Sequence, residues 1–264
     1  TFLVTSVAAA GFAVDKRMSS FTTDIPLDVR LGVPTTHRPL KWAFLGAGRV
    51  AHDFANAMKA CPLACLHGVA VRSEAHLGRC EAFREKHGFT KAYSSYEAAV
   101  SDPEVDVVYL CSMHSDRASH APLVLHAGKH LVIEKPIALT LKDAEAFAAL
   151  AKAKNCFLME GMWTRFFPAV EAARTLMDQG KIGRVVNVVS DFGFDAGDSG
   201  RYPTTPTDVT DGDPIYHKAI GGGALLWAGP YPVAAGILPF SGGLGGGLGE
   251  NNGEVQVKTI AATG

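Results

Sequence analysis

Short apolar runs alternate with amphipathic segments between residues 40 and 161. The apolar runs lie at 42–45, 66–71, 105–111, 130–133 and 156–159, and their length is typical of buried strands. Helical patterns begin after Gly48 and at about 75, 94, 117 and 140. Strands and helices that alternate at this spacing predict a doubly wound α/β fold, with a parallel sheet and helices on both faces.

Two of these helices begin with residues that can cap them. Ser94 is predicted to accept a hydrogen bond from the backbone N–H of Glu97, whose side chain reaches back to form a capping box. The segment that starts at Thr140 is predicted to cap the helix that ends near Lys154.

The pattern changes after residue 161, and three regions are predicted. An extended arm occupies 1–39, the strand–helix domain occupies 40–161, and a second α/β domain occupies 162–264. In this second domain a helix is expected at 169–179. A long apolar run at 184–194 and a last run at 254–261 are expected to be strands of an open sheet.

The segment KWAFLGAGRVA, residues 41–51, joins the first strand to the first helix through a glycine turn. Gly46 permits the tight turn, Gly48 lets the backbone approach a pyrophosphate, and Ala51 is small enough for close helix–strand packing. The free N–H groups of the helix N-terminus would hold the phosphates. The segment therefore predicts dinucleotide binding, with an ordinary strand–helix turn as the alternative.

Composition narrows the class of protein. The chain has 264 residues, 47% of them apolar, and a formal net charge of −1, so nothing points to nucleic acid or to an anionic membrane surface. Its ten histidines lack a ligand-like spacing, which predicts no metal site. The five cysteines form no CxxC pair and predict a reducing intracellular compartment.

The apolar segment 2–14 is too short to span a bilayer and lacks a basic flank in front of it. It is interpreted as a docking arm or as the remnant of a removed targeting peptide. The location expected is therefore the cytoplasm or an organelle.

The tripeptide Glu134-Lys135-Pro136 follows the fourth predicted strand, and two further blocks read FLMEGMWTRFFP (157–168) and GGGALLWAGPYPV (221–233). With the glycine turn, these motifs resemble the glucose–fructose oxidoreductase / inositol dehydrogenase (Gfo/Idh/MocA) family. The resemblance implies a Rossmann domain and a second domain with an open, mainly antiparallel sheet. It also implies a small-molecule substrate and either a homodimer or docking into a larger protein complex.

The resemblance implies catalytic roles for Lys135, beside the nicotinamide, and for Tyr231, as the general acid/base. Oxidation of a carbinol carbon requires the hydroxyl proton to leave, and a tyrosine with a pKa near 10 needs a cation such as Lys135 to act at neutral pH. The alternative for Lys135 is a solvated lysine in a turn, and the alternative for Tyr231 is a half-buried aromatic residue. The substrate pocket is expected to include Trp163, Arg165 and Trp227.

Cofactor contacts are predicted at the ends of the strands, and residues near the second strand decide between NADP and NAD. Arg72 can bind the NADP phosphate, whereas the nearby Glu74 would suit NAD, so NADP is predicted and NAD remains open. The predicted cofactor-binding residues are Gly46, Gly48, Arg49, Val50, Ala51, Arg72, Ser73, Ser112, His114, Glu134, Lys135 and Pro136.

Three features depart from the family. Trp227 stands where the family usually has Asp, and Arg117 stands where the family has His after the third strand, with His114 three residues earlier. The chain also ends after 254–261, where family members continue. The leading hypothesis is an NADP-dependent oxidoreductase that acts on a small polyol, aldose or trans-diol. The alternative is a catalytically impaired Rossmann subunit with a structural role in a larger assembly.

Overall fold

The computed structural model describes residues 38–183, 185–193, 217 and 220–240. They divide into two compact units, which are described separately. The first comprises the residues up to Gly161 with Phe166–Pro168, and the second comprises Met162–Arg165 and the residues from Ala169. The predicted strand at 254–261 and residues 1–37 of the predicted arm lie outside the described residues.

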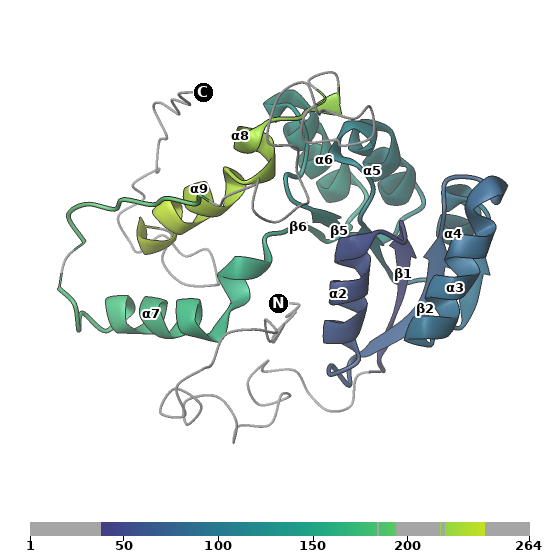
Figure 1. Ribbon diagram of the computed structural model, residues 1–264, viewed down its shortest axis with the longest axis horizontal. Coiled ribbons are helices and arrows are strands. Elements are labelled where there is room, and N and C mark those ends of the chain that lie inside the picture. The colour runs from purple at the N-terminus through teal and green to yellow at the C-terminus, as the bar shows by residue number, and fades with distance from the viewer. Residues whose placement is uncertain (1–37, 184, 194–216, 218–219, 241–264) are drawn as a thin grey trace. The chain divides into compact units, whose positions relative to one another are not determined.

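The first unit is built on a six-stranded parallel sheet with the order β3-β2-β1-β4-β5-β6 (Figure 1). The predicted parallel sheet is therefore confirmed, and the order is that of a Rossmann fold. The short strand β3 was absent from the sequence prediction. The strands are β1 (Leu40–Leu45), β2 (Ala64–Ala70), β3 (Lys91–Tyr93), β4 (Val107–Leu110), β5 (His130–Glu134) and β6 (Leu158–Gly161).

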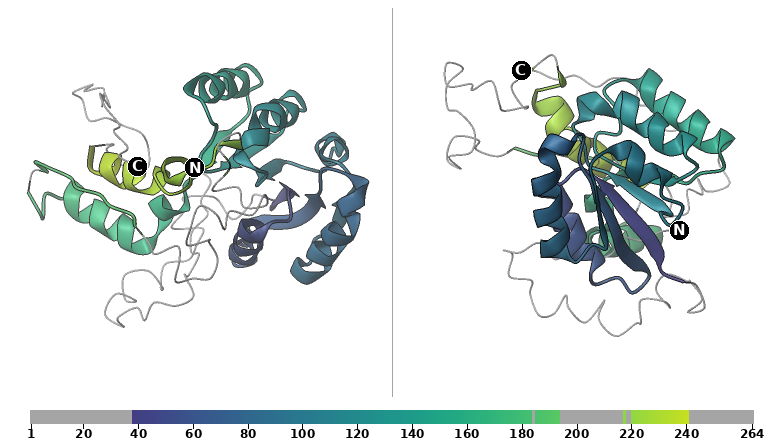
Figure 2. Two further views of the ribbon diagram at one scale, coloured as in Figure 1. Left: turned by 45° about the horizontal axis from the view of Figure 1, so that its top comes forward. Right: turned by 90° about the vertical axis from the view of Figure 1, so that its right-hand side faces the viewer.

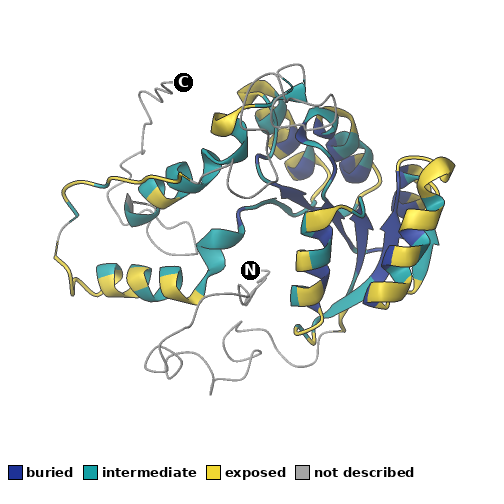
Figure 3. Cartoon of the chain, in the orientation of Figure 1, coloured by how far each residue is buried: buried dark blue, intermediate teal, exposed yellow. Residues whose placement is uncertain are grey.

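Five helices cover the two faces of this sheet, as Figure 2 shows from a second side. On one face α2 (Arg49–Met58) and α3 (Leu77–His87) pack against alternate strand residues such as Phe44 and Tyr109. On the other face lie α4 (Tyr96–Ser101), α5 (Arg117–His126) and α6 (Leu141–Ala153). They pack against the strand residues that point to that face, such as Leu45 and Leu110. Because both faces are covered, the four inner strands β2, β1, β4 and β5 are buried over most of their length, whereas the edge strands β3 and β6 are half-buried (Figure 3).

The two predicted caps have different outcomes. Thr140 caps α6 as predicted, because its hydroxyl accepts a hydrogen bond from the Asp143 N–H at 3.1 Å. The capping box at Ser94 was wrong by one residue. Ser95 is the cap of α4, and its hydroxyl accepts from the Ala98 N–H at 3.1 Å. Adjacent serines offer the same hydroxyl, and the backbone decides which one lies in the extended conformation of a cap.

A pair of histidines joins α2 to α3. The Nδ1 of His52 lies 2.6 Å from the Nε2 of His87, and both rings pack against Phe83. The other nitrogen of His87 is buried with no hydrogen-bond partner among the described residues. Burial and the nearby Lys59 lower the pKa of His87 to about 4, so this pair is uncharged at neutral pH.

In the second unit the described residues form helices and an extended segment. A 3₁₀ turn (Trp163–Phe166) precedes α7 (Pro168–Asp178), and α8 (Ala224–Trp227) is followed by α9 (Pro230–Ile237) and a 3₁₀ turn (Leu238–Phe240). The strand predicted at 184–194 is not formed by its described residues, 185–193. Val186 and Val189 are 78% and 88% exposed, because no strand of the described residues pairs with this segment.

No helix among the described residues is long and apolar enough to cross a membrane.

Candidate functional site

The predicted cofactor residues of the first unit follow the carboxyl ends of four adjacent strands, β2, β1, β4 and β5. The chain runs outward from β1 to β2 and β3 on one side, and from β4 to β6 on the other. The direction of the connections thus changes between β1 and β4. In open α/β sheets the crevice at such a point binds the ligand, so the topology brings these residues to the expected edge.

Gly46 makes the tight turn after β1 and has a φ of +119°, a conformation that favours glycine. Its N–H donates to the Ala70 carbonyl at 3.0 Å, and its carbonyl accepts from the Cys111 thiol at 3.2 Å. A Cβ at this position would lie 3.1 Å from the Cys111 sulfur. The turn is therefore packed directly against the end of β4, and only glycine fits there.

Gly48 has a different environment. It precedes α2 with a φ of −87°, and an added Cβ would meet no described atom within 4 Å. The first turn of α2 has no side-chain cap and no acidic residue. Its Ala51 N–H donates to the Gly48 carbonyl at 3.1 Å, and the N–H groups ahead of Ala51 have no partner within the helix. Arg49 is exposed and Val50 half-buried, whereas Ala51 is fully buried. This loop and helix therefore fit a pyrophosphate, which would supply acceptors for the free N–H groups.

Arg72 and Ser73 follow β2 and are exposed. The Nη1 of Arg72 donates to Asp116 Oδ2 at 2.8 Å, and the Ser73 hydroxyl lies 3.0 Å from the Nδ1 of His76. Asp116 thus holds one end of the guanidinium fork, and its remaining donors can still reach a phosphate. Neither Asp116 nor His76 was among the predicted site residues.

Ser112 and His114 follow β4, and both are buried, with 8% and 5% of their surface exposed. The Ser112 hydroxyl lies 3.2 Å from the Nδ1 of His120 on α5. His114 begins the 3₁₀ turn that leads into α5. Both side chains therefore lie in the interior of the unit, next to the carboxyl end of β4.

Glu134 ends β5, Lys135 and Pro136 follow it, and the Lys135–Pro136 peptide is cis. The buried Glu134 carboxylate accepts a hydrogen bond from the hydroxyl of Tyr109 at 2.6 Å and one from the Lys135 N–H at 3.2 Å. Burial raises the pKa of Glu134 despite these bonds, and burial lowers the pKa of the half-buried Lys135. Glu134 is thus an acidic side chain buried in the fold, and Lys135 releases its proton at a lower pH than an exposed lysine does.

Sequence reasoning missed Tyr109 and Asp116, which hold two of the predicted residues from distant parts of the chain. A tyrosine in the middle of an otherwise aliphatic buried strand was the available signal for Tyr109, because a buried phenol needs a hydrogen-bond partner. Asp116 gave no comparable signal, since a single acidic residue at the start of a helix is an ordinary feature.

The second unit contains the remaining predicted residues. The indole N–H of Trp163 donates to the hydroxyl of Tyr231 at 3.2 Å, and the rings of Phe192 and Tyr231 lie 5.0 Å apart. Trp227 ends α8, and both Trp227 and Arg165 are half-buried. The structure therefore brings Trp163 and Tyr231 together, as expected of residues that share a site.

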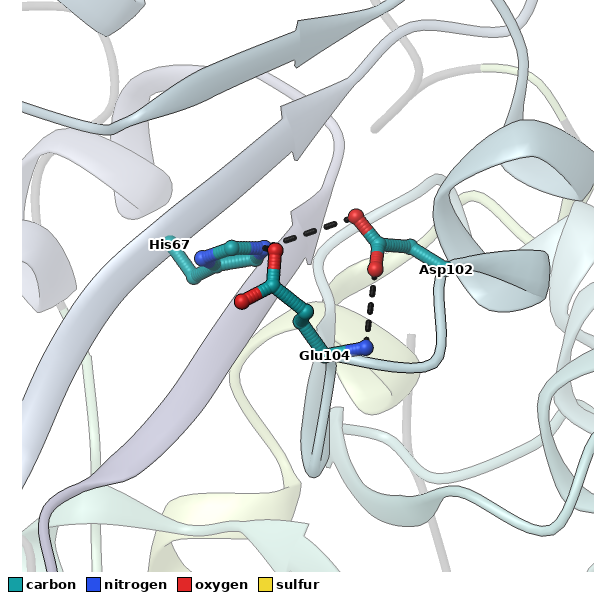
Figure 4. A group of neighbouring side chains, drawn as sticks. All are labelled: His67, Asp102 and Glu104. Carbon is teal, nitrogen blue, oxygen red and sulfur yellow. Dashed lines mark hydrogen bonds and ion pairs between the residues drawn. The ribbon is translucent and has the colours of Figure 1, made fainter.

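A second polar cluster, His67, Asp102 and Glu104, resembles a metal site in its donors (Figure 4). The Nε2 of His67 lies 3.5 Å from Asp102 and 3.9 Å from Glu104. However, the ammonium of Lys91 lies 2.8 Å and 2.9 Å from the same two carboxylate oxygens. Although burial opposes the shift, hydrogen bonds from Lys91 and Tyr93 hold the pKa of Asp102 well below its usual range. Lys91 thus already supplies the positive charge, and the absence of a bound metal stays a prediction.

Comparisons with known proteins agree with this geometry. Residues 40–162 match the oxidoreductase family with an NAD-binding Rossmann fold known as Gfo/Idh/MocA. Trans-1,2-dihydrobenzene-1,2-diol dehydrogenase of Danio rerio is 36% identical over 203 residues, which are 77% of this chain and 57% of the relative. The Homo sapiens protein of the same name is 34% identical over 203 residues, with the same shares. The chain thus spans little more than half the length of these relatives.

Among solved structures, KijD10, a 3-ketoreductase from Actinomadura kijaniata in complex with NADP and TDP-benzene, is similar with a TM-score of 0.64. The sequence identity is 28%, and the match covers 76% of this chain and 57% of that one. The family predicted from the glycine turn and Glu134-Lys135-Pro136 is therefore confirmed. Through residues 40–162, this chain belongs to the Gfo/Idh/MocA family of oxidoreductases with an NAD-binding Rossmann fold.

Proposed function

We propose that the protein is an NADP-dependent oxidoreductase that transfers a hydride between the nicotinamide and a small polyol, aldose or trans-diol. The observation that carries the proposal is the position of Lys135, half-buried at the carboxyl end of β5 with a lowered pKa. A perturbed lysine at a ligand-binding sheet edge is a candidate for acid–base chemistry. The relatives named as dihydrodiol dehydrogenases support the substrate class.

NADP, when bound, supplies the site that accepts or donates the hydride. The protein's own residues do the rest. The glycine turn and the first turn of α2 bind the pyrophosphate, and Lys135 places a positive charge beside the reacting hydroxyl. Tyr231 takes the hydroxyl proton, and the hydrogen bond from Trp163 both orients its phenol and favours the phenolate. Arg165 and Trp227 line the substrate side.

The preference for NADP depends on Arg72, which lies after the end of β2, where Rossmann folds contact the ribose of the cofactor. Its side chain is 60% exposed, and its guanidinium is held at one end by Asp116. A fork that is already oriented loses less side-chain freedom when it binds a phosphate. The complex of KijD10 with NADP supports this choice.

Replacing Lys135 by methionine tests the assignment, because methionine keeps much of the volume and removes the charge. Loss of positioned acid–base catalysis should lower kcat about 10²–10⁴-fold on xylose or a cyclic trans-diol, with the fold retained. Lys129→Met is a matched control, since Lys129 donates to two backbone carbonyls on the other side of the unit, Asp102 and Val105, both at 2.8 Å. Full activity in the Lys135 variant would refute the assignment.

The alternative function is a Rossmann subunit that has lost catalysis and serves as a structural part of a larger assembly. Trp227 favours it, because an indole has one N–H donor, carries no charge and cannot polarise a hydroxyl as the family's Asp would. In that case the wild-type protein should bind NADPH and oxidise no polyol. Trp227→Asp should then lower the stability and restore little activity, because the half-buried ring loses its packing contacts and no catalytic machinery is left to rescue. Measurable wild-type kcat on any polyol, from a free homo-oligomer, would exclude this alternative.

Oligomeric state and location belong to the same proposal. A homodimer is expected of the enzyme, and docking into a larger protein complex is expected of the structural subunit. Sedimentation of the purified native protein would separate the two. A reducing compartment, in the cytoplasm or an organelle, is proposed for both, in agreement with five cysteines that are all free.

A further inference from the structure

The geometry points to Arg117 as a positioning residue for Lys135, which ties the turn that carries this lysine to the loop after β4. This inference rests on the proposed function in assigning a catalytic role to Lys135. Arg117 begins α5, and only 4% of its surface is exposed. It was noted in the sequence only as a departure, where the family has His.

The guanidinium of Arg117 binds three backbone carbonyls from two loops. Its Nε and Nη2 donate to the Ser112 carbonyl at 3.2 Å and 3.1 Å. Its Nη1 donates to the Glu134 carbonyl at 2.5 Å and also to the Pro136 carbonyl. The last two carbonyls belong to the residues on either side of Lys135. A single side chain therefore fixes the backbone in front of the lysine and behind it.

A neutral imidazole could not make this set of contacts. Histidine has two ring nitrogens, and only one of them is a donor in the neutral form, whereas arginine has five N–H donors in a rigid fork. The charge matters as well, because carbonyl oxygens stabilise a buried cation and no carboxylate forms an ion pair with Arg117 among the described residues. Arginine in place of the family's histidine thus puts a fixed positive charge next to the turn that carries Lys135.

That charge acts on Lys135 together with its other neighbours. The charged groups that face the lysine are Glu134 on β5, Arg117 on α5 and Glu160 on β6. Burial lowers the pKa of Lys135, the two carboxylates raise it, and Arg117 lowers it. Arg117 therefore holds the lysine in place and also makes its proton easier to lose.

The test measures the titration of Lys135 directly, in the full chain. Lysines are labelled by reductive ¹³C-methylation, and the Lys135 signal is assigned by its loss in Lys135→Met. Removing the charge in Arg117→Met should raise the pKa of Lys135 by about one pH unit, as expected for a partly buried pair of charges. If that variant does not fold, Arg117→Gln keeps amide donors for the carbonyls and removes the same charge.

Lys129→Met is the control, because it removes a half-buried cation–carbonyl contact elsewhere and should leave the Lys135 titration unchanged. A merely structural Arg117 would lower the stability of both variants and leave the Lys135 pKa as in the wild type, and that result would overturn the inference. In an active enzyme, the pH profile of kcat should move with the titration while the Kd for NADPH changes less than threefold. A wild type without turnover would refute the proposed function alone, since the titration needs no substrate.

Discussion

Replacing Gly46 by alanine should destabilise the first unit, whereas the same change at Gly48 should not. Gly46 has a φ of +119°, and an added Cβ would lie 3.1 Å from the Cys111 sulfur and 3.2 Å from the Cys111 carbonyl oxygen. The φ of Gly48 is −87°, which every residue adopts, and an added Cβ meets no described atom within 4 Å. Within this turn the backbone conformation and the packing therefore require glycine at position 46 and not at position 48.

The cost at Gly46 has two parts. An alanine held at this positive φ costs roughly 1–3 kcal/mol, and the crowding against Cys111 adds about 1–3 kcal/mol if the neighbours cannot move. They are constrained, because the Cys111 N–H donates to the Leu45 carbonyl at 3.1 Å within the sheet. The sum, about 2–6 kcal/mol, corresponds to a drop in Tm of roughly 6–20 °C for a domain of this size. At Gly48, alanine should be neutral or stabilise by up to about 1 kcal/mol.

Urea unfolding followed by circular dichroism measures the stability, and fluorescence titration with NADPH measures the affinity. Gly46→Ala should show a lower urea midpoint. Gly48→Ala should keep the wild-type midpoint and lose at least about tenfold in affinity, because its methyl group would occupy the space through which a pyrophosphate approaches. Cys111→Ala in the Gly46→Ala background should recover only part of the stability, since the backbone contact remains. A wild-type midpoint for Gly46→Ala would refute the reasoning on packing, and wild-type affinity for Gly48→Ala would refute the reasoning on the cofactor.

Three further changes test the surroundings of the site. Arg72→Ala should weaken NADPH binding about 10–100-fold and leave NADH binding unchanged. Asp116→Asn should weaken NADPH binding by a smaller factor, because the guanidinium loses the carboxylate that orients it; thermal shifts with both nucleotides measure both effects. His87 has a folded pKa of about 4, below its unfolded value of about 6.5, so the stability that the neutral ring contributes is complete above pH 6.5 and is lost as the pH falls toward 4. His87→Gln should flatten this part of the curve of stability against pH, and an unchanged slope would contradict the assignment. Tyr109→Phe removes the phenolic hydroxyl that donates to Glu134 at 2.6 Å, and should cost about 1–3 kcal/mol in urea unfolding because the buried carboxylate loses one of its hydrogen-bond donors.

The sequence predicted the sheet well because parallel strands that are buried on both faces are continuous apolar runs. Phe44 and Leu45 face opposite sides of the sheet, and both are fully buried. The strand β3 could not be predicted in this way. It has three residues, Lys91–Tyr93, all half-buried, and its place in the sheet comes from pairing with β2. The run at 184–194 gave the opposite error, since its apolar residues have the pattern of a strand and its described part has no partner.

The residues of the candidate site differ in the same way in how far the sequence could predict them. The turn at Gly46 could be predicted, because its positive φ and its close packing on Cys111 leave glycine as the signature; the role of Gly48 in binding a cofactor stays a prediction. The contacts of Tyr109 with Glu134 and of Asp116 with Arg72 join residues that are 25 and 44 positions apart. Tertiary structure alone brings such pairs together, and no local pattern distinguishes them from other polar residues.

The buried charges at the carboxyl edge bear on the choice between enzyme and structural subunit. Glu134 and Arg117 are 9% and 4% exposed. Burial raises the pKa of Glu134 and lowers the pKa of Arg117, which favours the neutral form of each. Burying charged groups is costly, and apolar residues of similar volume often stabilise a fold equally well or better. Stability alone therefore gives little reason for a carboxylate and a guanidinium beneath Lys135. Control of the position and protonation of this lysine gives a direct reason, so the cluster favours a working acid–base site, and the Lys135 titration in Arg117→Met is the measurement on which that preference depends.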